Sequence, residues 1–138
     1  PYMWRDEEQR QFFESQLRRI QEDEKLQNAV VFDPFGDDVG YWLRKIGHIL
    51  SVSDLESFHL AAAEGIASGA HPIFIEREGV REMFPWEAVN KDCTEAAECV
   101  YNYTPDPIQV ETNRRNLGET YGVSSVRKQL DTLIRLDR

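Results

Sequence analysis

Residues 48–75 read HILSVSDLESFHLAAAEGIASGAHPIFI. The first five residues form a short apolar run, which predicts a buried strand over 48–52. Small residues then fill a helical segment over 58–68, and Gly69 is placed to end it. A second apolar run predicts another strand over 72–75. This order predicts a pair of parallel strands joined by a crossover helix.

The segments on both sides continue the alternation of helices and strands. Upstream, Ala29–Asp33 predicts a buried strand that Pro34 ends. Helices are expected over 6–27 and from Asp37 or Asp38 to Gly47. Downstream, the pattern predicts a short helix, a short strand and three more helices, over residues 79–84, 88–89, 95–101, 107–120 and 124–136. The sequence therefore predicts an α/β fold: a Rossmann-like parallel sheet with flanking helices, and closing helices in residues 106–138 that pack on or beside it.

A ligand is expected at the carboxyl ends of the predicted strands. Open parallel sheets bind ligands at that edge, and helices that begin there offer free backbone N–H groups and a positive dipole end to phosphate. Here the strands end at Asp33, at Ser51–Asp54 and at Glu76. Arg77 and Glu78 follow the last of these ends and are expected in a charged surface loop.

Composition and charge exclude several classes of protein. With 138 residues the chain is long enough for one domain. The net charge of −9, without a basic face, argues against a nucleic-acid partner. No apolar run approaches the roughly 18–20 residues that a membrane span needs. We expect Cys93 and Cys99 to be reduced thiols in a cytoplasmic protein, since a spacing of six on a helix suits a disulfide poorly.

Two glutamates follow the strand over 48–52, one in the loop after it and one in the helix over 58–68. Glu56 is expected in the loop itself, at the ligand-binding edge of the sheet. Glu64 is expected inside the helix, where small neighbours predict that its carboxylate abuts something closely packed. A buried carboxylate needs hydrogen-bond partners, and the hydroxyls of a sugar or ribose would supply them.

These residues resemble the signature of group 1 glycosyltransferases, the retaining family 4 with the GT-B fold. That family carries two glutamates separated by seven residues, as Glu56 and Glu64 are here. Phe58 and Leu60 match the family pattern, whereas Ser57 and His59 stand where glycines are usual. The resemblance covers about residues 28–85. Other residues that match lie on both sides, at Gly36, Asp38, Gly69, Pro72, Gly79 and Glu82.

The resemblance implies a role for each residue of the motif. Glu56 would be the catalytic carboxylate beside the donor sugar, and Glu64 would bind the ribose of the nucleotide. The backbone amides of four residues would cradle the donor sugar and phosphate: Ser57, Phe58, His59 and Leu60. The donor, a nucleotide-diphosphate sugar, would be a substrate. No separate cofactor and no essential divalent ion would be needed, and the positive charge near the diphosphate would come from Arg and Lys residues that precede this segment.

We expect residues 1–138 to form one partial donor-binding domain, with the acceptor (a glycan, a lipid or a small molecule) bound by a domain elsewhere in the enzyme. The isolated chain is then expected to be inactive. The sheet edge near residues 30–32 would lack its neighbour strands and would favour a homodimer or a rearranged packing that covers it, and a clean monomer in sedimentation would count against this. Two alternatives stay open: a non-catalytic Rossmann-like binding or interaction module, and a receiver-like signalling domain, for which Asp33 alone is insufficient.

Overall fold

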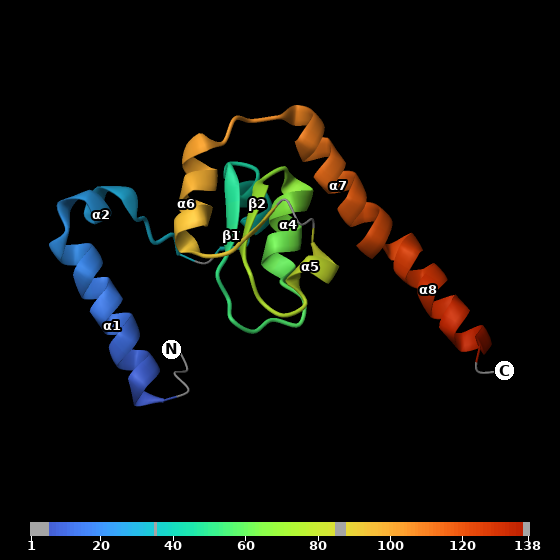
Figure 1. Ribbon diagram of the computed structural model, residues 1–138, viewed down its shortest axis with the longest axis horizontal. Coiled ribbons are helices and arrows are strands. Elements are labelled where there is room, and N and C mark those ends of the chain that lie inside the picture. Colours follow the sequence, from blue (N-terminus) through green and yellow to red (C-terminus); the bar gives the residue numbers. More distant parts are fainter. Residues whose placement is uncertain (1–5, 35, 85–87, 137–138) are drawn as a thin grey trace. The chain divides into compact units, whose positions relative to one another are not determined.

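The computed structural model describes residues 6–34, 36–84 and 88–136 and shows an α/β protein. Two compact units divide the chain, residues 1–37 and residues 38–138. In the second unit helices flank a three-stranded parallel sheet, and the chain closes on a long helical segment (Figure 1). The predicted α/β class, with its parallel sheet and closing helices, is therefore confirmed.

The first unit contains two helices, α1 (Glu7–Glu22) and α2 (Glu24–Ala29), where the sequence predicted one helix over 6–27. The break falls at Asp23, whose carboxylate accepts hydrogen bonds from the backbone N–H groups of Lys25 and Leu26. An aspartate that caps new N–H groups starts a second helix, because its own backbone then takes an extended conformation.

The strand predicted over Ala29–Asp33 is wrong. Ala29 belongs to α2, and the N–H of Val30 donates to the carbonyl of Leu26, closing the last turn of that helix. Val31 and Phe32 are 80% and 64% exposed, not buried. A short apolar run becomes a strand only when a neighbouring strand accepts its backbone, and these residues belong to the first unit, whereas the sheet lies in the second.

The sheet has the order β1–β2–β3, with all neighbours parallel. Its strands are β1 (His48–Ser51), β2 (His71–Ile75) and β3 (Val89–Asn90), so the strands predicted over 48–52, 72–75 and 88–89 are confirmed to within one residue. Ser51 pairs with Phe74, and Ile75 pairs with Asn90, so the three strands end at one edge. Among the described residues no strand pairs with the outer side of β1.

Helices cover both sides of this sheet. Figure 1 shows α4 on one side and α6 on the other, and α7 packs against α4. The helix α4 ends at Gly69, whose φ of 103° is the left-handed conformation that glycine adopts without strain. The helices of this unit are α3 (Val39–Leu43), α4 (Leu60–Ser68), α5 (Val80–Met83), α6 (Cys93–Asn102), α7 (Pro107–Tyr121) and α8 (Val123–Leu136).

The core lies between the sheet, α4 and α5. Phe74, the fourth of the five residues of β2, is fully buried and stacks on Phe84 with ring centroids 4.5 Å apart. Small and branched side chains fill the space around the two rings, namely Ala62, Ala63, Ile66, Val80 and Ala88. This core fixes the positions at which β1, β2 and α4 meet the carboxyl edge of the sheet.

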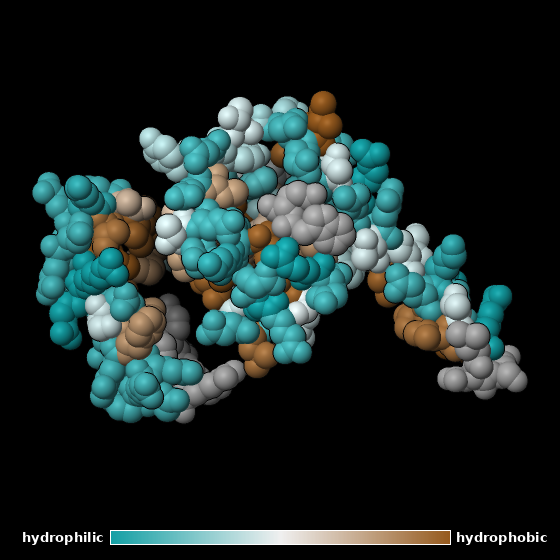
Figure 2. Space-filling view, viewed as in Figure 1, coloured by the Kyte–Doolittle hydropathy of each residue, from teal (hydrophilic) through white to brown (hydrophobic). Residues whose placement is uncertain are grey.

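Helix α8 carries an apolar stripe that is exposed in the chain. Figure 2 shows apolar side chains gathered on the visible face of this helix. The stripe consists of Val123, Val126, Leu130, Leu133 and Ile134, which are between 39% and 86% exposed. No described helix is long and apolar enough to cross a membrane. Both cysteines are free, as expected.

Candidate functional site

A hydrogen bond joins the end of β1 to the start of α4. Ser51, the last residue of β1, is buried, and its hydroxyl lies 2.6 Å from Nδ1 of His59. His59 is the residue that immediately precedes α4. The loop over residues 52–59 is therefore closed at its base, and its two ends are held in a fixed relation to the edge of the sheet.

Within this loop the carboxylate of Glu56 is held in place. The hydroxyl of Ser53 donates to Oε1 of Glu56 across 3.1 Å, and both residues are partly buried. This hydrogen bond from the short serine side chain restricts the rotamers that the longer glutamate side chain can adopt. Glu56 thus stands at the carboxyl edge of the sheet, at the position expected from the sequence.

The four residues predicted to form the amide cradle differ in burial, and His59, one of the two half-buried ones, is the partner of Ser51. The ring of Phe58 turns inward and packs against Phe84 and Tyr121, with ring centroids 5.8 and 4.9 Å apart. Ser57 and Leu60 have exposed side chains. Phe58 therefore anchors the loop, and any contact with a ligand from this position falls to its backbone.

The first turn of α4 has no side-chain cap. His59 takes the N-cap position, and its side chain makes no hydrogen bond to the helix because it bonds to Ser51 instead. The first N–H groups of a helix have no partner within the helix. The amino end of α4 therefore presents uncapped donors at the same edge of the sheet as Glu56.

The small residues of α4 allow the helix to pack closely against the sheet, and they do not enclose the side chain of Glu64. A Cβ added at Gly65 would lie 2.9 Å from Cβ of Ile49, so the helix backbone lies directly against β1. Glu64 lies on the exposed face of the helix. The expectation that its carboxylate abuts a closely packed surface is wrong, since the small side chains around it face the strand. Its binding of a ribose stays a prediction.

Arg77 is a residue whose environment the sequence did not reveal. It follows β2 by two residues, and its three guanidinium nitrogens (Nε, Nη1 and Nη2) are buried without a hydrogen-bond partner among the described residues. The neighbouring acid Glu76 is already paired with Arg81. Arg77 was expected to be a solvated loop residue. Its guanidinium group is instead covered and has no hydrogen-bond partner among the described residues. The only sign of this in the sequence was that Arg77 follows the end of a predicted strand.

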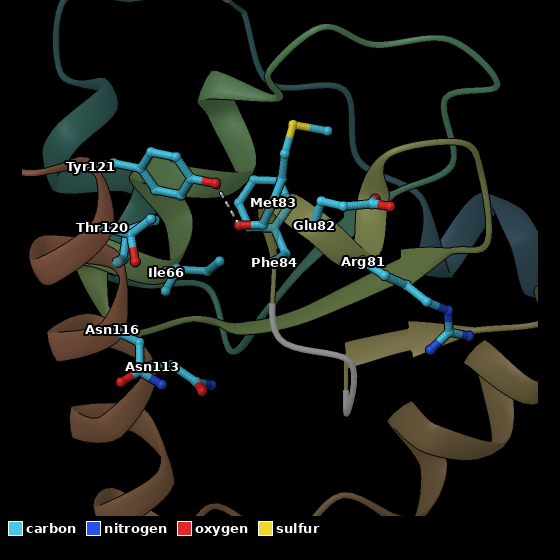
Figure 3. A pocket seen from close by; sticks show the side chains of 10 residues that line it. Ile66, Arg81, Glu82, Met83, Phe84, Asn113, Asn116, Thr120 and Tyr121 are labelled. Carbon is cyan, nitrogen blue, oxygen red and sulfur yellow. Dashed lines mark hydrogen bonds between the residues drawn. The ribbon is translucent and has the colours of Figure 1, made fainter. Parts of the chain in front are cut away.

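A groove of about 330 Å³ lies between α4, α5 and α7, and its lining residues do not include residues 52–60 themselves. In Figure 3, Asn113, Asn116 and Thr120 lie along α7, and the hydroxyl of Tyr121 donates to the carbonyl of Met83 across 3.0 Å. Burial raises the pKa of Tyr121, so this hydroxyl stays protonated as a donor. The groove is lined by Ile66, Arg81, Glu82, Met83, Phe84, Asn113, Asn116, Leu117, Thr120 and Tyr121.

Two histidines meet at the opposite, amino edge of the sheet. His48 and His71 begin β1 and β2 and are paired in register, with ring centroids 5.7 Å apart. Tyr103 packs on both rings. Nε2 of His48 and Nδ1 of His71 are buried without a hydrogen-bond partner among the described residues. Burial, and then the neighbouring His48, lower the pKa of His71.

This lowered pKa predicts a loss of stability in mild acid. The folded state favours neutral His71, so the stabilisation is complete above the unfolded pKa of about 6.5 and is lost as the pH falls below it. We expect the urea midpoint to fall between pH 7.5 and pH 5.5. In His71→Gln that fall should be smaller. Equal falls in the two proteins would show that His71 does not contribute.

No family model, no curated protein and no solved structure matches the chain. Within the described ranges no group of three or more His, Cys, Asp or Glu side chains could hold a metal ion. The geometry at the carboxyl edge of the sheet is therefore the basis for assigning a function.

Proposed function

We propose that this chain is part of the donor-binding domain of a retaining glycosyltransferase with the GT-B fold, and that its loop over residues 52–60 binds a nucleotide-diphosphate sugar. The proposal is supported by one observation above all. The uncapped amino end of α4 and the carboxylate of Glu56, which accepts a hydrogen bond from Ser53, belong to the same carboxyl edge of a Rossmann-like parallel sheet.

The uncapped helix end suits the diphosphate. Free N–H groups of the first turn and the positive end of the helix dipole both favour an anion there. His59 cannot cap these groups while it bonds to Ser51. The hydrogen bond therefore has a second effect besides closing the loop, since it keeps the donors of α4 available to a ligand.

The two glutamates suit the rest of the donor. Glu56, held by Ser53, would stand beside the sugar and stabilise positive charge that develops at the anomeric carbon. Glu64, which is exposed, would accept hydrogen bonds from ribose hydroxyls. The role of Glu56 uses the charge of its carboxylate, and the role of Glu64 uses carboxylate oxygens as hydrogen-bond acceptors.

The reaction would exchange one bond at the anomeric carbon for another on the same face. The bond to the phosphate oxygen breaks, the acceptor hydroxyl oxygen forms the new bond, and the departing phosphate takes the hydroxyl proton. The chain would contribute positioning and electrostatic stabilisation. The acceptor would be a glycan, a lipid or a small molecule bound outside this chain, so the chain alone is expected to be inactive.

The proposal predicts binding of a nucleotide-diphosphate sugar at this edge. In a titration with uridine- and guanosine-diphosphate sugars, one donor should shift NMR amide signals that cluster at Glu56–Glu64, with millimolar affinity. Glu64→Gln should weaken that binding by about tenfold, which corresponds to about 1.4 kcal/mol, because the carboxylate is a stronger acceptor than an amide.

The matched control is Glu98→Gln, which makes the same change on the exposed face of α6. It should leave the affinity unchanged. If neither class of donor shifts the amides at residues 56–64, or if the two variants weaken binding equally, the donor-site proposal is wrong.

The second candidate is a non-catalytic binding or interaction module. Two exposed features favour it: the unpaired side of β1, where Leu50 is 56% exposed, and the apolar stripe of α8. An open strand edge with an apolar side chain invites a second copy of the chain. Such a module would form a dimer in sedimentation and give no amide shifts with nucleotide sugars, whereas the donor domain gives the shifts in either oligomeric state.

A further inference from the structure

The groove between α4, α5 and α7 has fixed walls and an apolar floor. The hydroxyl of Tyr121 donates to the carbonyl of Met83 across 3.0 Å, which ties the end of α7 to α5 and sets the width of the groove. Ile66 and Phe84 line the groove and are 2% and 3% exposed. Ligand sites have volumes of about 300–1,000 Å³, so a groove of about 330 Å³ has room for a small molecule.

One wall of the groove is a row of uncharged polar side chains on α7. Asn113, Asn116 and Thr120 are spaced by three and four residues, which places them on one face of the helix (Figure 3). None of the three donates a side-chain hydrogen bond to another described residue. Thr112 on the same helix differs, because its hydroxyl donates to the carbonyl of Ile108. The groove therefore offers unused donors and acceptors along α7.

Asn113 is the most deeply buried polar residue of this wall. It is 6% exposed, and its Oδ1 accepts a hydrogen bond from Nε2 of Gln109 across 2.9 Å. Its Nδ2 donates to no described residue, yet it is not among the polar atoms that are fully covered, so it opens onto the groove. A largely buried donor without a partner costs free energy, which a ligand acceptor would recover. The second lone pair of Oδ1 is also available to a ligand donor.

The charges at the groove disfavour an anionic ligand. Nε of Arg81 donates to both carboxylate oxygens of Glu76, across 3.1 and 2.8 Å, so the charge of this arginine is already compensated. Glu82 also lines the groove, and its carboxylate forms no ion pair with any described residue. The chain as a whole carries a net charge of −9. An uncharged ligand is therefore favoured over an anion of the same shape.

We infer that this groove binds a small uncharged molecule that carries a primary carboxamide on an apolar ring. The carbonyl of the ligand accepts from Nδ2 of Asn113, and its N–H groups donate to Oδ1 of the same residue and to the hydroxyl of Thr120. The ring lies against Ile66 and Phe84, where the burial of its apolar surface stabilises the complex. The inference does not rest on the proposed function, since the loop over residues 52–60 is not part of the groove.

The test is an NMR titration of the full 138-residue chain with benzamide as the probe. Benzamide should shift the backbone amide signals of residues 113–121 and the side-chain NH₂ signals of Asn113, with a Kd of about 1 mM. Benzoate has the same ring and nearly the same shape, but it carries a charge and lacks N–H donors. It should bind about tenfold more weakly than benzamide, or less tightly still.

Asn113→Leu should weaken the binding of benzamide by about tenfold, because the carbonyl of the ligand loses its donor. The variant should fold, since Gln109, which loses its acceptor, is exposed and can bond to water. The matched control is Asn102→Leu, which makes the same change at an exposed position at the end of α6. It should bind benzamide as tightly as the wild type.

Three results would overturn the inference: no shift at residues 113–121 with benzamide, an equal affinity for benzoate, or an Asn113→Leu variant that binds benzamide as tightly as the wild type. The last result would show that the groove accepts apolar molecules without using its polar wall. If Asn113→Leu does not fold, the wild type decides in its place. Side-chain NH₂ signals of Asn113 that stay unmoved at saturating benzamide then overturn the inference.

Discussion

Replacing Phe74 with alanine is expected to lower the free energy of unfolding by about 3–5 kcal/mol. Phe74 has no exposed surface and belongs to the middle strand of the sheet, where its ring stacks on that of Phe84 with an angle of 21° between the planes. The truncation removes buried apolar surface and leaves a cavity that the surrounding backbone of the sheet cannot fill. Urea unfolding followed by circular dichroism measures the change.

A matched control is Phe12→Ala, because Phe12 lies on α1 and is 66% exposed. Its unfolding free energy should change by no more than about 0.5 kcal/mol. Domains of this size are stable by only about 5–15 kcal/mol, so Phe74→Ala is expected to remove a large share of the total. If Phe74→Ala and Phe12→Ala cost the same, the core does not lie where the structure places it.

Gly65→Ala is expected to destabilise the chain although alanine is the better helix former. The new methyl group would lie 2.9 Å from Cβ of Ile49 and 3.0 Å from both of its γ-carbons. The position of Cβ is set by the backbone, so a change of rotamer at Ile49 cannot move it away, and a β-branched side chain leaves little freedom to its γ-carbons. The steric cost of about 1–3 kcal/mol opposes a gain in helix propensity of about 1 kcal/mol. Crowding should win and lower the unfolding free energy.

Gly118→Ala is the control, since the same methyl group in α7 meets no atom within 4 Å. There the helix propensity acts alone, and a gain of about 0.5–1 kcal/mol is expected. The two alanine variants should therefore have opposite signs in the same urea experiment. A stabilising Gly65→Ala would show that α4 does not lie directly against β1. A shift of α4 would also disturb the hydrogen bond between Ser51 and His59.

The elements around the site were predictable because local signals mark both of their ends. Apolar runs mark β1 and β2, small residues fill α4, and glycine at position 69 is needed for a φ of 103°. The run at residues 29–33 carried the same apolar signal and failed. Such a run becomes a strand only if a partner strand is available to it. The sequence of the run does not reveal that these residues belong to another unit than the sheet.

The candidate site was predictable only in outline. The sequence placed Glu56 in a loop at the carboxyl edge, which the structure shows. It could not reveal that Ser51 takes the side chain of His59 away from α4, because that contact depends on how strand, loop and helix close together. Nor could it show that the guanidinium of Arg77 is covered, since burial at a loop position is set by tertiary packing. Electrostatic consequences follow from such contacts, so they appear only in the folded chain.

Helix α8 joins the rest of the second unit through a single residue, Gly122, which has an extended ψ of 149° between two helices. It follows α7 end to end in Figure 1 and leaves its apolar stripe in solvent. A helix of 14 residues is close to the length at which isolated helices are only marginally stable in water. Its backbone amides should therefore exchange with deuterium through local opening, whereas those of β2 should exchange only through global unfolding. The same local opening should expose the peptide bonds after Arg127 and Lys128 to trypsin. Cleavage there would remove the rest of α8 while the sheet is still folded.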